Sequence, residues 1–298
     1  MIHESLLRYR GARYSWWALG LCVASSLLYA TQGGRQEPGG GTWQGYVLGT
    51  VGALLIVWLA LLGVRKRRYS SGAGSVQGWT SAHVWLGLAL LLVATLHCAG
   101  RFGWNVHTLA YVLMCAVIIS GVFGVYVYLS TPRQLSANSN GSARAALFAE
   151  LFDLDRKGRD LAGKCDPAVN TSVKSSIERT MIGGGVTAQL LGIDRSLFMR
   201  ADPQAEGAGG ATVVANADQQ GVIDDVARRV PRAAKRTEAA NLQALIVLLC
   251  RRQAVLRRIR RDIRLHAWLR LWLYIHVPIT IALILALIVH IVTTFMYW

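Results

Sequence analysis

Five apolar stretches alternate with polar segments along the chain. They cover residues 15–30, 43–64, 82–100, 106–129 and 271–297. A helix needs about 20 apolar residues to cross the hydrocarbon layer of a membrane, so the last four stretches predict membrane-spanning helices. The first, SWWALGLCVASSLLYA, is the shortest and predicts either a span or an anchor in the membrane interface. We therefore expect an all-α membrane protein.

A long polar segment separates the fourth apolar stretch from the fifth. Its last part, from about Glu238, has leucines and isoleucines at helical spacing and no Gly or Pro before Pro278, which predicts a helix running into the last span. The stretch EGAGGATVVANADQQG, residues 206–221, is small and polar and indicates a flexible loop. Four parts follow: an N-terminal span or anchor with an outer loop (1–42), spans two to four of a helical bundle (43–130), a basic helical cytoplasmic insert (131–270) and a last span that completes the bundle (271–298).

The composition supports the membrane class. Hydrophobic residues make up 53% of the 298 residues and charged residues only 16%, and the ten Trp and ten Tyr are residue types that favour the membrane interface. The five cysteines are scattered, with no C-x-x-C or C-x-x-C-H motif. We expect no disulfide framework, no zinc site and no covalently attached haem.

The net charge of +16 is distributed unevenly along the chain. Only Arg35 and Arg101 lie in the loops of one side, so the other side, which holds the N-terminus and the insert, is predicted to be cytoplasmic by the positive-inside rule. A bacterial-type inner membrane is the expected location. Eight arginines between positions 251 and 270 predict contact with anionic membrane lipids first, and with an acidic electron-transfer partner second. Nucleic-acid binding is not expected, because no such motif is present.

Two apolar stretches each carry a pair of histidines. His83 and His97 lie fourteen residues apart, and so do His276 and His290. Fourteen residues bring a helix to within about 40° of a whole number of turns and advance it about 21 Å, so each pair shares one face of its helix, near opposite leaflets. Both spans run in the same direction in the predicted topology, which places His83 level with His276 and His97 level with His290. Two facing imidazoles at one depth suit a six-coordinate haem iron.

Other roles for these histidines are less consistent with the pattern. A single membrane histidine can hydrogen-bond to a neighbouring helix or line a proton path, but the repeated spacing on two parallel spans favours haem. Zinc or copper is the competing metal interpretation. The ~21 Å separation within a span prevents one small site from using both histidines of that span, and two histidines fall short of a tetrahedral ligand set.

The motifs H83-x13-H97 and H276-x13-H290 resemble the paired-histidine helices of the cytochrome b subunit of quinol:cytochrome c complexes and of the ferric reductase and NADPH oxidase membrane domains. The resemblance covers about 43–130 and 271–298. It implies a four-span bundle with two haems b, held by the axial pairs His83–His276 and His97–His290, and electron transfer across the bilayer. The chain departs from these families in having no PEWY-like quinol motif and no flavin and nicotinamide domain after Trp298.

Residues near the four histidines are candidates for contact with the cofactor. Arg101 is predicted to pair with the outer haem propionates, since a guanidinium matches a carboxylate, although a solvated loop charge is an equal alternative. Arg264 and Arg270 are candidates for the inner propionates, with anionic lipid as the alternative. Gly87, one turn after His83, is the glycine expected to face a haem.

Three further residues are given other roles. His107 is predicted to be an interfacial histidine hydrogen-bonded to a loop, with contact to an outer quinol, a haem propionate or a partner as the alternative. Met114 and Met296 are expected to be packing residues rather than axial ligands.

These features predict a carrier of single electrons between a cytoplasmic or membrane donor, such as a quinol, and an acceptor on the outer face. The redox chemistry would belong to the haems. We expect the chain to work as a subunit of a larger redox assembly, with the insert as docking element and a quinone as a further cofactor candidate. The alternatives are a self-sufficient quinol-dependent metal or oxygen reductase, and a transporter or anchor without haem.

Overall fold

The computed structural model describes residues 9–32, 39–67, 75–130, 140–201, 211–233 and 235–296. The chain divides into two compact units, Met1–Tyr126 with Leu271–Trp298, and Val127–Arg270. We call them the membrane unit and the insert unit and describe each by itself.

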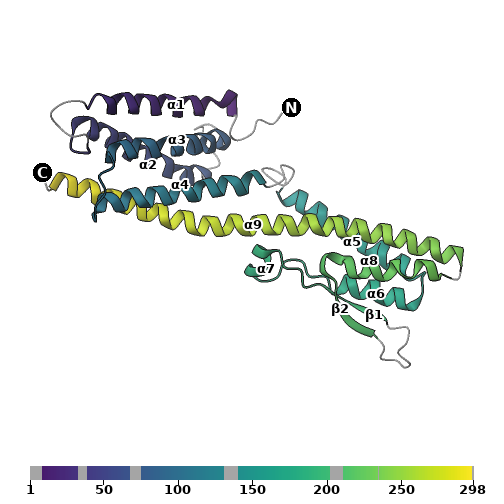
Figure 1. Cartoon of the computed structure of the whole chain (residues 1–298). Helices are drawn as coiled ribbons and strands as arrows, with labels where there is room; N and C mark the ends of the chain where they lie inside the picture. The colour runs from purple at the N-terminus through teal and green to yellow at the C-terminus, as the bar shows by residue number, and fades with distance from the viewer. Residues whose placement is uncertain are drawn as a thin grey trace. The chain divides into compact units, whose positions relative to one another are not determined.

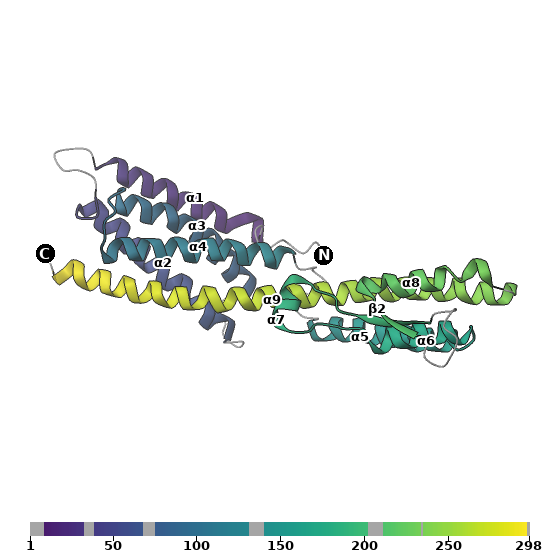
Figure 2. The same cartoon turned by 60° about the horizontal axis from the view of Figure 1, so that its bottom comes forward.

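The membrane unit is a bundle of helices. It contains α1 (Tyr9–Ala30), α2 (Trp43–Arg67), α3 (Val76–Cys98), most of α4 (Val106–Ser130) and the C-terminal part of α9 (Arg236–Met296). Figures 1 and 2 show these segments running side by side, with α3 packed against both α1 and α2. Helix α9 is continuous over 61 residues, which confirms the predicted helix that runs into the last apolar stretch.

Four helices in the described part of the chain are long and apolar enough to cross a membrane: α2, α3, α4 and α9. They correspond to the last four apolar stretches, so the prediction of a helical membrane protein is confirmed at this level. Large apolar side chains such as Leu54, Ile119 and Leu285 are more than half exposed on these helices, an arrangement suited to lipid rather than water. Helix α1 is not among the four.

Both ends of α3 are set by local chemistry. The Ser75 hydroxyl caps its N-terminus by accepting a hydrogen bond from the Gly78 amide at 3.1 Å. At the other end Ala99 (φ +48°) and Gly100 (φ +72°) adopt the left-handed conformation that terminates helices. His97 therefore lies in the last turn of α3.

An apolar layer fills the middle of the membrane unit. Leu90 of α3 and Leu283 of α9 are each 3% exposed, and each lies seven residues from both histidines of its helix. They pack with Met114 of α4 and with Ile56 and Leu59 of α2. Met114 is therefore a packing residue, as predicted. The apolar layer to which it belongs separates two levels of histidines.

The insert unit combines helices with one β-hairpin. Strands β1 (Leu197–Ala201) and β2 (Ala211–Ala215) pair antiparallel, with Leu197 opposite Ala215. The surrounding elements are α5 (Asn140–Ala162), α6 (Pro167–Glu178), α7 (Val186–Leu191), η3 (Ala217–Gln219), α8 (Gln220–Ala227), η4 (Val230–Arg232) and the N-terminal part of α9. Phe198 of β1 is fully buried among aliphatic side chains of α6, α8 and α9.

The sequence predicted a flexible loop at residues 206–221. For residues 211–221, which the structure describes, this prediction is wrong. These residues form β2, η3 and the start of α8, and Asn216 and Gln219 are buried. Small residues are needed here for close packing, since a Cβ on Gly221 would lie 2.8 Å from Cε1 of Phe198. Residues 206–210 lie outside the described residues.

A buried arginine organises the polar core of the insert unit. Arg252 of α9 is 1% exposed. It donates to the Asp155 carboxylate at 2.6 Å, to the Gln219 side-chain oxygen at 2.6 Å and to the Thr180 hydroxyl at 3.0 Å. Burial lowers the pKa of this guanidinium, and Asp155 opposes that shift. One cation thus ties α5, the segment after α6, η3 and α9 together.

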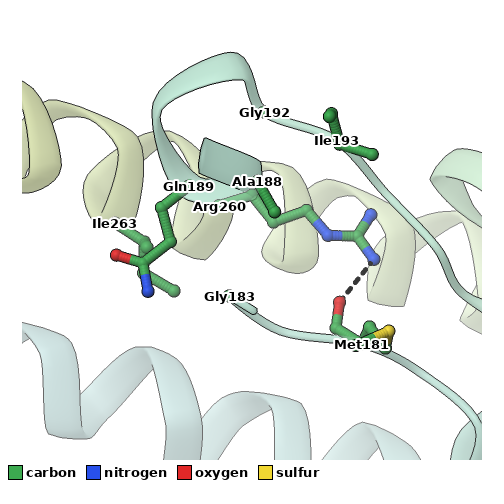
Figure 3. A pocket seen from close by; sticks show the side chains of 8 residues that line it. All are labelled: Met181, Gly183, Ala188, Gln189, Gly192, Ile193, Arg260 and Ile263. Atoms are coloured by element: carbon green, nitrogen blue, oxygen red, sulfur yellow. Dashed lines mark hydrogen bonds between the residues drawn. The ribbon is translucent and has the colours of Figure 1, made fainter. Parts of the chain in front are cut away.

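The insert unit also has a small hollow, shown in Figure 3. It lies between the segment around α7 and helix α9 and has a volume of about 20 Å³. Arg260 lines it and donates to the Met181 carbonyl at 3.1 Å. A space of this size holds about one water molecule, so it is too small for a cofactor.

We predict that Asp155→Ala destabilises the insert unit by about 3 kcal/mol, because it leaves the Arg252 charge buried without its partner. Hydrogen exchange of the α5 and α6 amides in the full-length, detergent-solubilised chain measures this as faster exchange. The matched control is Asp153→Ala on the same helix, whose ion pairs with Arg156 and Lys157 are on the surface and should matter little. Equal exchange in the two variants would contradict the role given to Arg252.

Candidate functional site

The described histidines of the membrane unit lie at two levels, one on each side of the apolar layer. His83 and His276 form the level that we call inner, and His97 and His290 belong to the level that we call outer, after the predicted orientation. The inner imidazoles lie close enough to interact electrostatically, and the outer ring centroids lie 6.2 Å apart. The outer pair that the fourteen-residue spacing predicts therefore lies in ring contact, and the inner pair lies within electrostatic range.

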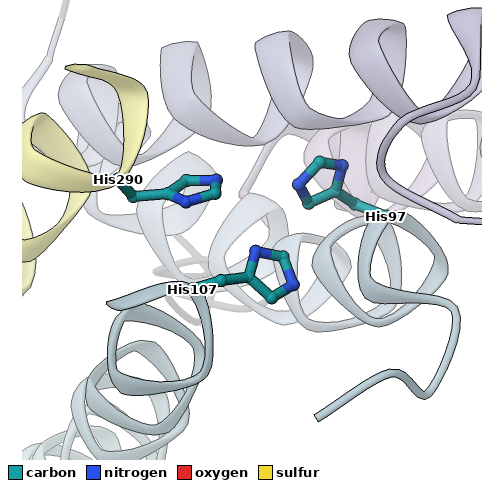
Figure 4. A group of neighbouring side chains, drawn as sticks. All are labelled: His97, His107 and His290. Atoms are coloured by element: carbon teal, nitrogen blue, oxygen red, sulfur yellow. The ribbon is translucent and has the colours of Figure 1, made fainter. Parts of the chain in front are cut away.

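A third imidazole joins the outer level. His107, the second residue of α4, lies 5.4 Å from His97 and 4.9 Å from His290 between ring centroids. Figure 4 shows the three rings turned toward one another. The sequence analysis placed His107 against a loop and so missed this group, because no matching spacing links α4 to the other two helices.

Backbone carbonyls hold two of the imidazoles. The Nδ1 atom of His83 lies 3.1 Å from the Leu59 carbonyl oxygen, and the Nδ1 atom of His97 lies 2.8 Å from that of Gly45. A carbonyl oxygen only accepts hydrogen bonds, so Nδ1 must carry the proton in both rings. The Nε2 atom then keeps a free lone pair, which is the form that ligates a metal.

A serine holds the inner histidine of α9. The Ser120 hydroxyl lies 2.7 Å from Nδ1 of His276 and donates its own proton to the Val117 carbonyl at 2.8 Å. It therefore accepts from Nδ1 of His276, which again leaves Nε2 free. Trp272 adds a further constraint, because its indole donates to the Ser120 carbonyl at 2.8 Å and its ring lies 5.2 Å from the His276 ring.

Glycines make room for these side chains. A Cβ on Gly124 would lie 2.3 Å from the Trp272 ring, and one on Gly49 would lie 2.7 Å from Cε1 of His97. Gly121 lies beside the inner histidine His276. A Cβ added to Gly121 would lie 3.7 Å from Cε1 of that ring. A Cβ on Gly87, the glycine predicted to face a haem, would lie 4.0 Å from Cδ1 of Leu59 in α2.

The predicted cations lie at different distances from the histidines. Arg101 follows the end of α3, is exposed and lies beside Gly39, while Arg270 is exposed at the edge of the insert unit. The cation that interacts electrostatically with both inner histidines is Lys66, near the end of α2. The sequence analysis did not single out Lys66, which lies in a run of four basic residues at 65–68.

The donor set fits a haem at the inner level. Two imidazoles from different helices, each with Nδ1 anchored, provide the two axial nitrogens that a bis-histidine iron needs. The outer pair also fits, since a metal with bonds of about 2.0 Å to each nitrogen needs ring centroids about 6 Å apart. His107, however, lies almost equally far from both outer rings, and so stands where a macrocycle between them would extend. It has to turn aside for that group to bind.

No protein-family model, no curated protein and no solved structure matches this chain. Its function must therefore be argued from the histidines and their surroundings.

We predict that Gly124→Ala lowers the stability of the membrane unit by about 1–3 kcal/mol, because the new methyl group overlaps the Trp272 ring. The measurement is the thermal unfolding midpoint of the detergent-purified chain. Gly63→Ala is the matched control, since a Cβ there meets no atom within 4 Å. The double variant Gly124→Ala with Trp272→Phe should recover part of the loss. An unchanged midpoint for Gly124→Ala alone would show that Trp272 is not held as described.

Proposed function

We propose that this chain is a di-haem membrane cytochrome b that passes single electrons across the bilayer. One haem b would be held by His83 and His276 and the other by His97 and His290. The observation that carries the proposal is the fixed tautomer at the predicted ligands: His83, His97 and His276 each present a free Nε2 because Nδ1 is engaged by a carbonyl or by Ser120. The same arrangement recurs on α3 and α9 and at both levels.

The chain's own residues would hold the cofactors in place. Helices α3 and α9 set the separation of the two levels at about 21 Å along the helix axis, and the hydrogen bonds to Nδ1 fix the rotation of each imidazole and raise its basicity. When bound, each haem supplies a one-electron iron couple in low-dielectric surroundings. Lys66 and, at the other level, Arg101 are the cations placed to pair with haem propionates.

The apolar layer argues against a proton-relay transporter. Between the two histidine levels the buried side chains include Leu90, Met114 and Leu283, each no more than 3% exposed. These three side chains neither donate nor accept protons, so they provide no carrier for a proton relay. An electron needs no such path, because it can tunnel through an apolar layer between two redox centres.

The cellular setting is part of the proposal. We place the chain in a bacterial-type inner membrane with the insert unit in the cytoplasm, where its basic residues would contact anionic lipids and other redox subunits. A quinol is the proposed membrane donor and an electron carrier the outer partner. A self-sufficient reductase is distinguished by a direct assay: quinol would reduce it and ferric chelates or superoxide would re-oxidise it without added subunits.

The decisive experiment is a pyridine haemochrome assay with a redox difference spectrum of the purified protein. We expect two b-type haems per chain, and one each in His83→Ala and His290→Ala, with different haems lost. His266→Ala is the matched control and should keep both, because His266 lies in the insert unit and bonds to the Asp262 carbonyl. A well-folded chain without haem would overturn the proposal in favour of a transporter or anchor.

A further inference from the structure

Three helices each contribute one imidazole to the outer level. His97 comes from the last turn of α3, His107 from the first turn of α4 and His290 from α9. One nitrogen of each ring lies within 4.8 Å of the others, and Figure 4 shows the three rings converging on one point. Two of these histidines serve the proposed outer haem, but the third has no part in it.

The surroundings of His97 prepare it to bind an ion. Its Nδ1 proton is donated to Gly45, so its Nε2 atom is the ligand. The ring also has little freedom to move, because it packs directly against two glycines. A Cβ added to Gly49 would lie 2.7 Å from Cε1 of His97, and one added to Gly40 would lie 3.4 Å from it. Only glycine at position 49 lets the ring approach so closely, whereas a Cβ at position 40 would be in ordinary van der Waals contact with it.

The ligand type selects the ion. Imidazole nitrogens bind zinc, copper, cobalt and nickel, whereas calcium and magnesium require oxygen ligands. Around such an ion, with bonds of about 2.0–2.1 Å, three nitrogens lie roughly 3.4 Å from one another. The ligand nitrogens of the three outer histidines lie within 4.8 Å of one another, so rotations of His107 and His290 about a fixed His97 would have to close the set around an ion. Three protein nitrogens would leave a fourth position for water, as in open zinc sites.

We propose that His97, His107 and His290 form a binding site for one divalent transition-metal ion in chains whose outer haem is absent. The ion and the outer haem compete, because both use His97 and His290 and because His107 stands where the macrocycle would extend. His107 is thus required for the ion and dispensable for the haem. The competition rests on the proposed function, whereas the ion site itself does not.

Cobalt is the probe, because tetrahedral Co²⁺ absorbs strongly in the visible range. Full-length chain purified in detergent from haem-limited cells is titrated with Co²⁺ alone, and its haem content is measured in the same sample. We expect one Co²⁺ per chain. His107→Ala should weaken binding roughly 100-fold, since loss of a ligand costs at least as much as loss of an outer-shell partner, while His266→Ala, in the insert unit, should bind like the unmodified chain. Circular dichroism verifies the fold, and His107→Asn provides a second, polar replacement.

The outcomes separate this inference from the proposed function. Co²⁺ binding that is equal with and without His107, or absent altogether, overturns the metal site whatever the haem content. A chain that never acquires haem but binds Co²⁺ through His107 removes the cytochrome proposal and leaves the metal site standing. Fully haem-loaded chain should bind no Co²⁺ at this site, and tight binding there that depends on His107 would overturn the competition. His107→Ala should load two haems as the unmodified chain does.

Discussion

An imidazole N–H inside a membrane needs an acceptor, because the hydrocarbon offers no water, and the site of this protein depends on how that need is met. The Leu59 and Gly45 carbonyls accept from His83 and His97, and Ser120 accepts from His276. Each bond satisfies the donor that would be costly to bury unpaired. Each also fixes which nitrogen is left with a lone pair. Stability and ligand chemistry therefore arise from the same contacts.

These contacts act through the regular geometry of two helices. A repeat of fourteen residues returns each helix to nearly the same face, so α3 and α9 can each present a histidine at two equivalent levels. The residues halfway between them, Leu90 and Leu283, meet in a dry layer with Met114. The result is two polar sites separated by apolar packing, which is the arrangement on which the proposed electron transfer rests.

The sequence predicts regular features well and tertiary coincidences poorly. Apolar runs and helical spacing sufficed for α2, α3, α4 and the continuity of α9, because both follow from the hydrophobic effect along one helix. His107 escaped prediction, since its approach to His97 depends on how α3 ends at Ala99 and where α4 begins. The hairpin of the insert unit was missed because β2 is short and is surrounded by small residues, whose role is close packing against Phe198 rather than flexibility.

The most direct test of the central claim is the location of iron in crystals of the purified protein by anomalous diffraction at the iron absorption edge. The proposal predicts two iron positions about 21 Å apart, one between His83 and His276 and the other between His97 and His290. Crystals without iron at either level, or with a metal bound only by the three outer histidines, would contradict a di-haem conduit.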